Sequence, residues 1–151
     1  MHTITPGASR TVGLGFIGAV ALLLAGSTAA SATASSSPPC VAAARACVDL
    51  SAQQAWLTRD GDVIYGPVPV ATGKAGAPTD RGIFRVFWKD RHHRSSLFDN
   101  APMPYSVFYN GDEAFHEGKL TNRSHGCVRL IRRDAQTFYN TLHSGDVVQV
   151  V

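Results

Sequence analysis

Cysteine and histidine side chains that could act as a nucleophile and its base stand close together near the C-terminal end of the chain. His125 and Cys127 belong to the stretch "RSHGCVRL", and His116 precedes that cysteine by eleven residues. A thiol becomes a strong nucleophile once it loses its proton, and a neighbouring imidazole can accept that proton. Gly126 lets the backbone turn tightly beside the cysteine, so that consecutive N–H groups could face a developing oxyanion. The pattern predicts a cysteine nucleophile.

Two histidines compete for the role of the base. If the stretch around His125 is extended, its side chain and that of Cys127 share a face, with Cβ atoms roughly 6–7 Å apart. His116 belongs to a different segment, so tertiary folding can bring its ring directly to the sulfur. This geometry favours His116 as the base and gives His125 an orienting role.

Two other roles for Cys127 remain open on residue types alone. A lone cysteine is often a small buried apolar residue. His116, His125 and Cys127 together also offer three donors for zinc, although the paired C-x-x-C or H-x-x-H spacing of zinc sites is missing. We therefore expect no metal and treat the nucleophile as the first hypothesis.

The three cysteines suggest one bridge and one free thiol. Cys40 and Cys47 lie seven residues apart and, in an exported chain, could form a disulfide within an N-terminal arm over 35–47. Two free cysteines, or pairing with another chain, are the alternatives. In each case Cys127 has no obvious partner within the chain.

Residues 1–34 have the pattern of a signal peptide. An apolar run over 11–25 is followed by small residues, and 30–32 and 32–34 both fit an A-x-A cleavage rule. The run is short for a membrane span, which needs roughly 20 apolar residues, so cleavage is preferred over a retained anchor. We expect an exported, cell-wall-associated protein that is extracellular or periplasmic.

The formal charge of +3 and the absence of nucleic-acid-binding motifs argue against nucleic acid as a partner.

The elements that must position the cluster lie in a predicted domain over 48–151. Alternation and β-branched or aromatic residues predict short strands, Gly/Pro-rich stretches predict loops, and one late segment has helical spacing. Strands are expected over 48–51, 54–58, 63–65, 68–72, 82–88, 105–110, 113–116 and 146–151, loops over 73–79 and 89–100, and a helix over 132–143. The fold class is therefore mainly β, a small sandwich or barrel with one or two short helices.

Individual residues give further expectations. Pro69 indicates an edge strand, and Asp60-Gly61 indicates a hairpin turn. Trp56, Phe84 and Trp88 are expected in the core.

The stretch "SHGCVR", preceded by "FHEG", resembles the signature of L,D-transpeptidases of the YkuD type. Agreement continues through much of 48–151, including Met103-Pro104-Tyr105. The resemblance implies a β-sandwich catalytic domain in which Cys127 is the nucleophile, His116 the proton acceptor and donor, and His125 a supporting residue. It further implies that Ser124 and Gly126 belong to the oxyanion loop, formed by the backbone at Gly126 and Cys127.

On the substrate side, the resemblance implies that Tyr105 and Ser106 lie near the acyl-donor groove. Arg129 would hold the loop by hydrogen bonds or contact a substrate carboxylate. Two departures stand out: the loop between His116 and Ser124 is shorter than in many members, and Glu117 stands where Gly or Ser often follows the histidine.

The implied activity is peptidoglycan L,D-transpeptidation without a cofactor. A thioester on Cys127 would form from a tetrapeptide stem and pass to an amine of another stem, which gives a 3→3 cross-link. The implied partners are peptidoglycan stem peptides, with carbapenem β-lactams as inhibitors. Transfer to water would make the protein an L,D-carboxypeptidase, and a non-catalytic cell-wall-binding module is the alternative from another class. We expect a stand-alone catalytic domain.

Overall fold

The computed structural model describes residues 37–151, so the predicted signal peptide lies outside the described residues. The described part contains nine strands and one helix. None of its helices is both long and apolar enough to cross a bilayer.

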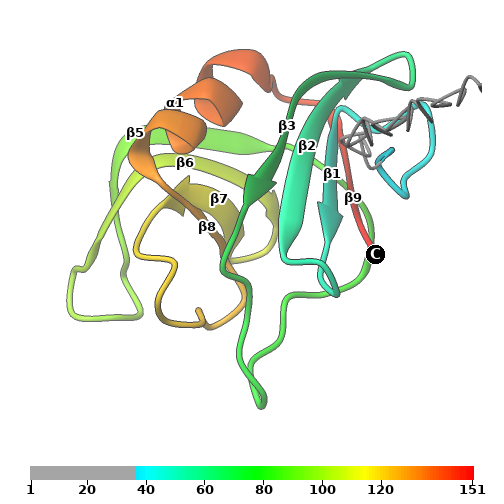
Figure 1. The fold of residues 1–151 in the computed structure, drawn as a ribbon. Coiled ribbons are helices and arrows are strands. Elements are labelled where there is room, and N and C mark those ends of the chain that lie inside the picture. The colour runs from blue at the N-terminus through cyan, green and yellow to red at the C-terminus, as the bar shows by residue number, and fades with distance from the viewer. Residues whose placement is uncertain (1–36) are drawn as a thin grey trace, which may run out of the picture. The chain divides into compact units, whose positions relative to one another are not determined.

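Two sheets face each other across a shared core, as Figure 1 shows. The five-stranded sheet has the order β3-β2-β1-β9-β4 and the four-stranded sheet the order β5-β6-β7-β8. In the first sheet the strands are β3 (Asp62–Pro69), β2 (Gln54–Arg59), β1 (Ala46–Asp49), β9 (Val147–Val150) and β4 (Gly82–Arg85). In the second they are β5 (Trp88–Arg94), β6 (Pro102–Asn110), β7 (Glu113–Glu117) and β8 (Val128–Leu130). The mainly β fold class is confirmed.

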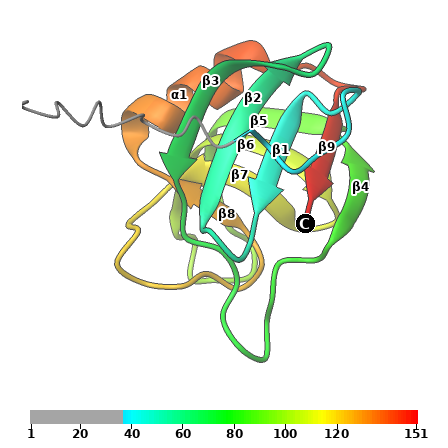
Figure 2. The same ribbon diagram turned by 45° about the vertical axis from the view of Figure 1, so that its right-hand side comes forward.

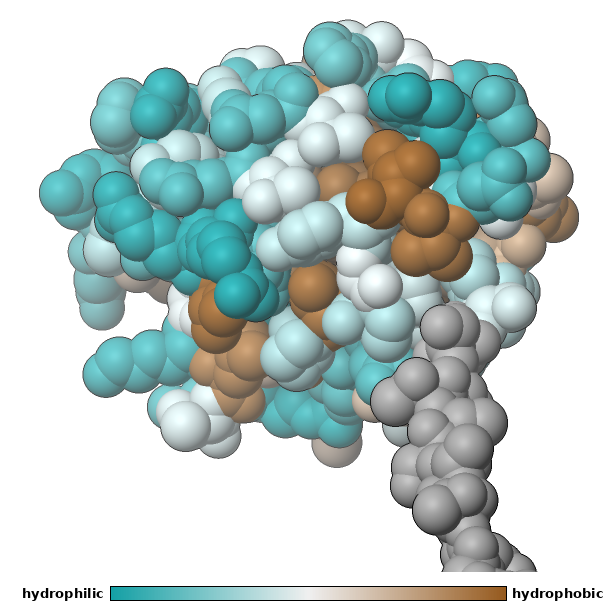
Figure 3. All heavy atoms as spheres, turned by 45° about the horizontal axis from the view of Figure 1, so that its top comes forward, coloured by the Kyte–Doolittle hydropathy of each residue, from teal (hydrophilic) through white to brown (hydrophobic). Residues whose placement is uncertain are grey.

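The core lies between the sheets and under the helix. Leu57 and Val148 from the first sheet meet Phe115 and Leu130 from the second in one buried cluster. Helix α1 (Arg132–Thr141) buries Ala135 and Phe138 against this cluster, because these residues recur on one helical face. Figure 2 shows the five-stranded sheet in front of the four-stranded one, with the helix beside them. Figure 3 shows a face of mostly hydrophilic residues with small hydrophobic groups, as expected for a water-exposed surface.

Local turn chemistry agrees with the sequence. Asp60 and Gly61 both have positive φ, 53° and 91°, and close the β2–β3 hairpin, which is the backbone form that two-residue hairpin turns favour. Pro69 ends β3, which is an edge strand, so its missing N–H leaves no ladder position empty. The predicted helix is present and ends two residues early, at Thr141.

Two neighbouring predictions were wrong. The single strand expected over 82–88 is two strands, β4 and β5, which belong to different sheets. The chain crosses between sheets at Val86, which is buried, and Phe87, which is exposed. The loop expected over 89–100 is strand β5 as far as Arg94. Polar residues are tolerated there because β5 is an edge strand with much of its length in water.

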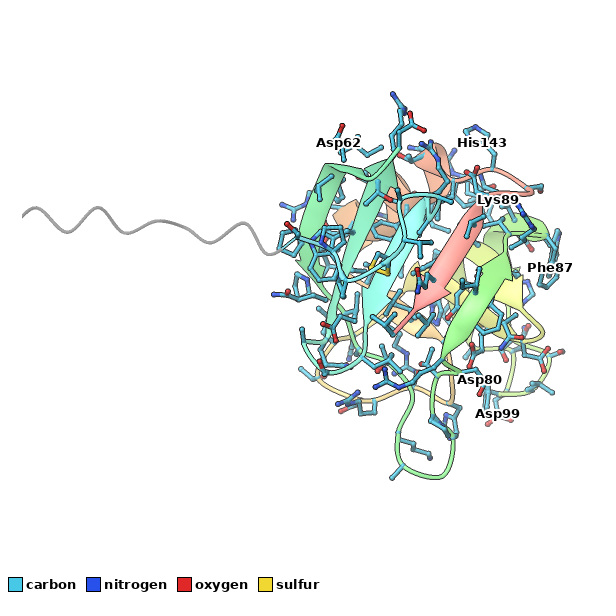
Figure 4. All side chains as sticks on the ribbon, turned by 90° about the vertical axis from the view of Figure 1, so that its right-hand side faces the viewer. Asp62, Asp80, Phe87, Lys89, Asp99 and His143 are labelled. Carbon is cyan, nitrogen blue, oxygen red and sulfur yellow. A yellow bond between two sulfur atoms is a disulfide. The ribbon has the colours of Figure 1, made fainter. Side chains whose placement is uncertain are left out.

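Of the aromatic residues expected in the core, Trp56 is buried and Phe84 packs against the core from its edge. Trp88 is not a core residue. It is 46% exposed and stacks on Phe108, with 4.7 Å between ring centroids. Figure 4 shows the nearby Phe87 and Lys89 on the outside of the domain.

The N-terminal arm is tied to the domain covalently. A disulfide joins Cys40 to Cys47, the second residue of β1 (Figure 4). Cys47 is fully buried, and Val41 N–H donates to Gln149 Oε1 of β9 at 2.7 Å. Cys127 is the remaining, free cysteine.

Candidate active site

A cavity of about 490 Å³ opens at the end of the four-stranded sheet. Its walls include His116, His125, Cys127 and Arg129, so the structure brings together four of the predicted site residues. The register explains this convergence. Strands β7 and β8 run parallel, with His116 opposite Arg129 and Phe115 opposite Val128. Cys127 immediately precedes β8, and the pairing therefore brings it close to His116 despite their separation in sequence.

The His116 ring is held in one orientation. His116 is buried, and its Nδ1 donates to the carbonyl oxygen of Glu117 at 2.7 Å. Because a carbonyl can only accept, Nδ1 carries the proton and Nε2 of the neutral ring has a free lone pair. Burial lowers the pKa of His116 to about 4, although the bond to Glu117 acts in the opposite direction. The ring is therefore neutral near pH 7 and able to accept a proton.

The Cys127 thiol is partly buried and protonated at rest. Its Sγ donates to the carbonyl oxygen of Asp112 at 3.4 Å. Burial raises the pKa of the thiol, and the charges of Glu113 and Asp112 raise it further, while the Ala114 N–H and Arg129 lower it. The resting site consequently contains a neutral thiol and a neutral imidazole rather than an ion pair.

The turn that carries the thiol is braced from inside. Ser124 is buried, and its Oγ donates to the carbonyl oxygen of Cys127 at 2.5 Å and accepts from the Gly126 N–H at 3.1 Å. Gly126 has a φ of +123°, a region that side chains rarely adopt. The Gly126 N–H is thus already bonded within the turn. Of the two backbone N–H groups predicted to face an oxyanion, those of Gly126 and Cys127, the one of Cys127 therefore remains as the candidate donor.

Thr79 braces the same turn from outside, and sequence reasoning missed it. Its Oγ1 donates to the Gly126 carbonyl oxygen at 2.6 Å and accepts from the Gly73 N–H at 2.9 Å. Thr79 is buried, with 3% of its surface exposed. The segment from Thr72 to Lys74 also pairs with Ser124 through backbone hydrogen bonds. Loop 73–79 is therefore a support for the catalytic turn.

His125 lies in a different environment from His116. It is exposed, and its ring packs against that of Phe98 at an interplanar angle of 31°, with centroids 4.7 Å apart. Phe98 and Leu97 belong to the β5–β6 connection and line the cavity. The exposed position leaves the buried His116 as the better-oriented base and assigns His125 to the cavity wall.

Tyr105 and Ser106 do not line the cavity. Tyr105 faces α1, where its hydroxyl accepts from Gln136 Nε2 at 2.7 Å. Ser106 is fully buried, and its Oγ donates to the carbonyl oxygen of Met103 at 2.8 Å. Tyr105 has a φ of +59°, unusual for a bulky residue. This backbone change reverses the alternation of β6, so that Met103 and Phe108 both reach the cavity while Tyr105 joins the core.

Arg129 joins the two sides of the cavity mouth. Its Nη1 donates to the carbonyl oxygen of Asn122 at 3.3 Å, and a Cβ added at Gly118 would lie 2.8 Å from its Cδ. Arg129 therefore contacts both ends of loop 118–123 and also lines the cavity. Glu117 pairs with Arg132 of α1, with 3.4 Å between Oε2 and Nη1.

Among residues 37–151, no three His, Cys, Asp or Glu side chains converge in a way that would hold a metal ion. His116, His125 and Cys127 share a cavity, but they do not form a ligand cluster.

Known proteins share the sequence pattern and the fold of this domain. Residues 43–150 match the L,D-transpeptidase catalytic domain family known as YkuD. L,D-transpeptidase 2 of Mycobacterium tuberculosis (strain CDC 1551 / Oshkosh) is 31% identical over an alignment of length 111, and the match covers 61% of this chain and 27% of that protein. The crystal structure of an L,D-transpeptidase from Stackebrandtia nassauensis has a TM-score of 0.67 and 36% identity, and the match covers 70% of this chain and 54% of that one.

The structure of the L,D-transpeptidase LdtMt1 in complex with imipenem shares the fold, with a TM-score of 0.62 and 24% identity over 69% of this chain and 56% of that one. The chain spans about half the length of these two solved relatives and about a quarter of the curated one.

Proposed function

Because this chain belongs to the YkuD family of L,D-transpeptidase catalytic domains, we propose that it joins peptidoglycan stem peptides through 3→3 cross-links. It is an enzyme of the L,D-transpeptidase family. The observation that carries the proposal is that Cys127 lines the same cavity as a buried His116 whose Nδ1 is bonded to Glu117. This arrangement is the nucleophile, base and orienting acceptor that covalent acyl transfer requires.

In the first step, His116 Nε2 removes the thiol proton as Sγ of Cys127 attacks the carbonyl carbon that follows the third residue of a tetrapeptide stem. A C–S bond forms and the C–N bond to the terminal D-alanine breaks. His116 gives its proton to the departing amine. The thiol and the imidazole are both neutral at rest, so proton removal accompanies the attack rather than precedes it.

In the second step, an amine of another stem attacks the thioester. A new C–N bond forms, the C–S bond breaks, and the amine proton returns to Sγ through His116. Water in place of the amine would release a tripeptide stem instead. The ratio of these two products decides between transpeptidase and L,D-carboxypeptidase activity.

The tetrahedral intermediates carry an oxyanion that a backbone donor must stabilise. The Gly126 N–H is bonded to Ser124 Oγ, so we assign this role to the Cys127 N–H. Ser124 and Thr79 act through the turn, because they hold the backbone on both sides of Gly126.

The chemistry of the residues in the cavity walls indicates which substrate groups they recognise. Arg129 presents a guanidinium to the cavity and suits a stem-peptide carboxylate. Met103, Phe108 and Leu97 supply apolar surface for the aliphatic parts of the stem. A carbapenem is a fitting acylating inhibitor, because it offers a strained carbonyl to the same thiol and LdtMt1 was solved with imipenem.

We further infer that the protein acts outside the cytoplasm, at the cell wall. The Cys40–Cys47 disulfide supports this placement, since such bonds persist in oxidising compartments. The predicted signal peptide over 1–34 is consistent with it.

Product analysis with a purified disaccharide-tetrapeptide tests the function. We expect cross-linked dimers with loss of D-alanine from wild type and none from Cys127→Ala. Binding of the muropeptide without any new product would favour a wall-binding module, and a tripeptide stem as sole product would favour the carboxypeptidase.

A further inference from the structure

A buried carboxylate lies directly beneath the turn that carries Cys127. Glu113 is the first residue of β7 and only 9% exposed. Its Oε1 accepts from the Asp80 N–H at 2.8 Å, and its Oε2 accepts from Asn110 Nδ2 at 3.3 Å. Both oxygens act as acceptors, which suits the ionised form. Burial raises the pKa of the Glu113 carboxyl, while the hydrogen bonds from Asp80 and Asn110 lower it. Among the salt bridges of residues 37–151, none involves Glu113.

The carboxylate touches the catalytic turn at the residue before the nucleophile. A Cβ added at Gly126 would lie 3.2 Å from Glu113 Oε1 and 3.4 Å from its Cγ. The Glu113 side chain thus occupies the space beside the Gly126 Cα. Through Asp80 it also joins the end of loop 73–79, which holds the opposite side of this turn through Thr79.

The charged and titratable groups around the thiol are mostly acidic or neutral on the Glu113 side. They are Glu113 and Asp112 from the β6–β7 turn, Asp80 behind Glu113, Tyr109 from β6, and His116 and Arg129 from the two parallel strands. The Tyr109 hydroxyl is buried next to Glu113, and burial together with the Glu113 charge raises its pKa. A buried negative charge beside Gly126, the residue before the nucleophile, disfavours a second negative charge on the thiolate, and it raises the pKa of the Cys127 thiol.

We propose that Glu113 is a positioning residue for the nucleophile: its carboxylate fixes the Cys127 turn from beneath, and its negative charge restrains the reactivity of the resting thiol. The inference rests on the proposed role of Cys127. By disfavouring the thiolate, the Glu113 charge would protect Cys127, because the thiolate is the form that reacts with oxidants and disulfides. An exported enzyme with a free cysteine benefits from a thiol that loses its proton only when His116 accepts it during the reaction.

The pH dependence of alkylation of Cys127 by iodoacetamide tests the proposal without any substrate. The other two cysteines form the disulfide, so the reagent reports on Cys127 alone. Glu113→Gln keeps an acceptor for the Asp80 N–H and removes the charge. We expect it to react about three- to tenfold faster than wild type at pH 7, with the midpoint of the pH profile moved to lower pH.

Two matched variants separate charge from shape. Glu113→Asp retains the charge and should keep a midpoint close to wild type. Asp112→Asn removes an exposed charge of the same turn and should shift the midpoint less than Glu113→Gln, because water screens it. A melting curve checks that each variant is folded.

An unchanged or higher midpoint in folded Glu113→Gln would overturn the proposal. If Glu113→Gln does not fold, Glu113→Asp provides the test. A midpoint of its alkylation pH profile that moves to lower pH by more than that of Asp112→Asn would contradict a role for the charge. Failure of the cross-linking function has a different signature, because alkylation depends only on the thiol and not on transfer to a stem peptide.

Discussion

The Nδ1 of His116 donates a hydrogen bond to the carbonyl oxygen of Glu117, the next residue in the chain, at 2.7 Å. This bond needs no side chain from Glu117, so a residue of any type at that position can provide it. It leaves Nε2 unprotonated in the neutral ring and fixes the plane of the imidazole. The departure of Glu117 from the usual Gly or Ser therefore leaves the orientation of the base intact.

His116→Ala should slow acylation of the enzyme by about 10²–10⁴-fold, because the thiol loses the group that accepts its proton. The rate of imipenem adduct formation, followed by intact-protein mass, provides the measurement. His125→Ala is the matched control and should lose much less, since His125 is an exposed part of the cavity wall packed against Phe98. A larger loss in His125→Ala would reverse the assignment of the base.

The acid limb of the acylation rate should follow protonation of His116. Its pKa is lowered to about 4, so the neutral, base-competent ring predominates above that pH and is lost as the pH falls through it. We expect the rate to be maintained from pH 7 to about pH 5 and to decline near pH 4. A decline centred near pH 6.5, the ordinary value for histidine, would show that the ring is not buried as described.

The same lowered pKa makes the folded state less stable in acid. Between the ordinary pKa and about 4, the unfolded chain binds a proton that folded His116 does not, so stability falls as the pH is reduced through this window. His116→Gln should show a smaller fall in unfolding free energy between pH 7 and pH 4.5, measured by urea denaturation. Equal falls in both proteins would contradict the burial of this ring.

Thr79→Val should weaken the catalytic turn while preserving the shape of the side chain. The change removes the donor to Gly126 O and the acceptor for Gly73 N–H. Leaving buried backbone groups unpaired is expected to reduce stability by about 1–3 kcal/mol and to slow acylation. Thr79→Ser keeps the hydroxyl and should preserve most of the activity. Chemical denaturation and the imipenem reaction measure the two effects, and identical behaviour of both variants would exclude the hydroxyl as a brace.

Removal of the disulfide by Cys40→Ser/Cys47→Ser should lower stability by about 2 kcal/mol without abolishing acylation. The bridge fixes the arm against β1, on the sheet opposite Cys127. Thermal melting and the imipenem reaction of the same sample distinguish the effects. Loss of acylation in a folded double variant would mean that the arm contributes to the site.

The candidate site residues that line one cavity could be recognised because they stand in one short stretch. His116, His125 and Cys127 are recognisable by type and spacing, and the hairpin signal at Asp60-Gly61 fixes a local turn without help from the rest of the fold. Strand β5 could not be predicted, because an edge strand that is largely exposed needs no apolar alternation. Its polar residues have the composition of a loop, which explains the wrong prediction over 89–94.

The supporting residues were hidden for a different reason. Thr79 and Glu113 act on Gly126 from segments 47 and 13 residues away in sequence, and nothing in their local sequence indicates these contacts. Tyr105 likewise combines a positive φ with a hydrogen bond from Gln136 of α1, a contact that is distant in sequence. It turns Tyr105 away from the cavity and places Met103 there, a reversal that strand periodicity alone cannot reveal.

The nucleophile itself is tested most directly by intact-protein mass spectrometry after incubation with imipenem. The wild-type chain should gain the mass of one imipenem, peptide mapping should place it on Cys127, and Cys127→Ala should remain unmodified. The absence of an adduct on folded wild type, or an undiminished adduct on Cys127→Ala, would contradict the assignment of Cys127 as the acylated residue.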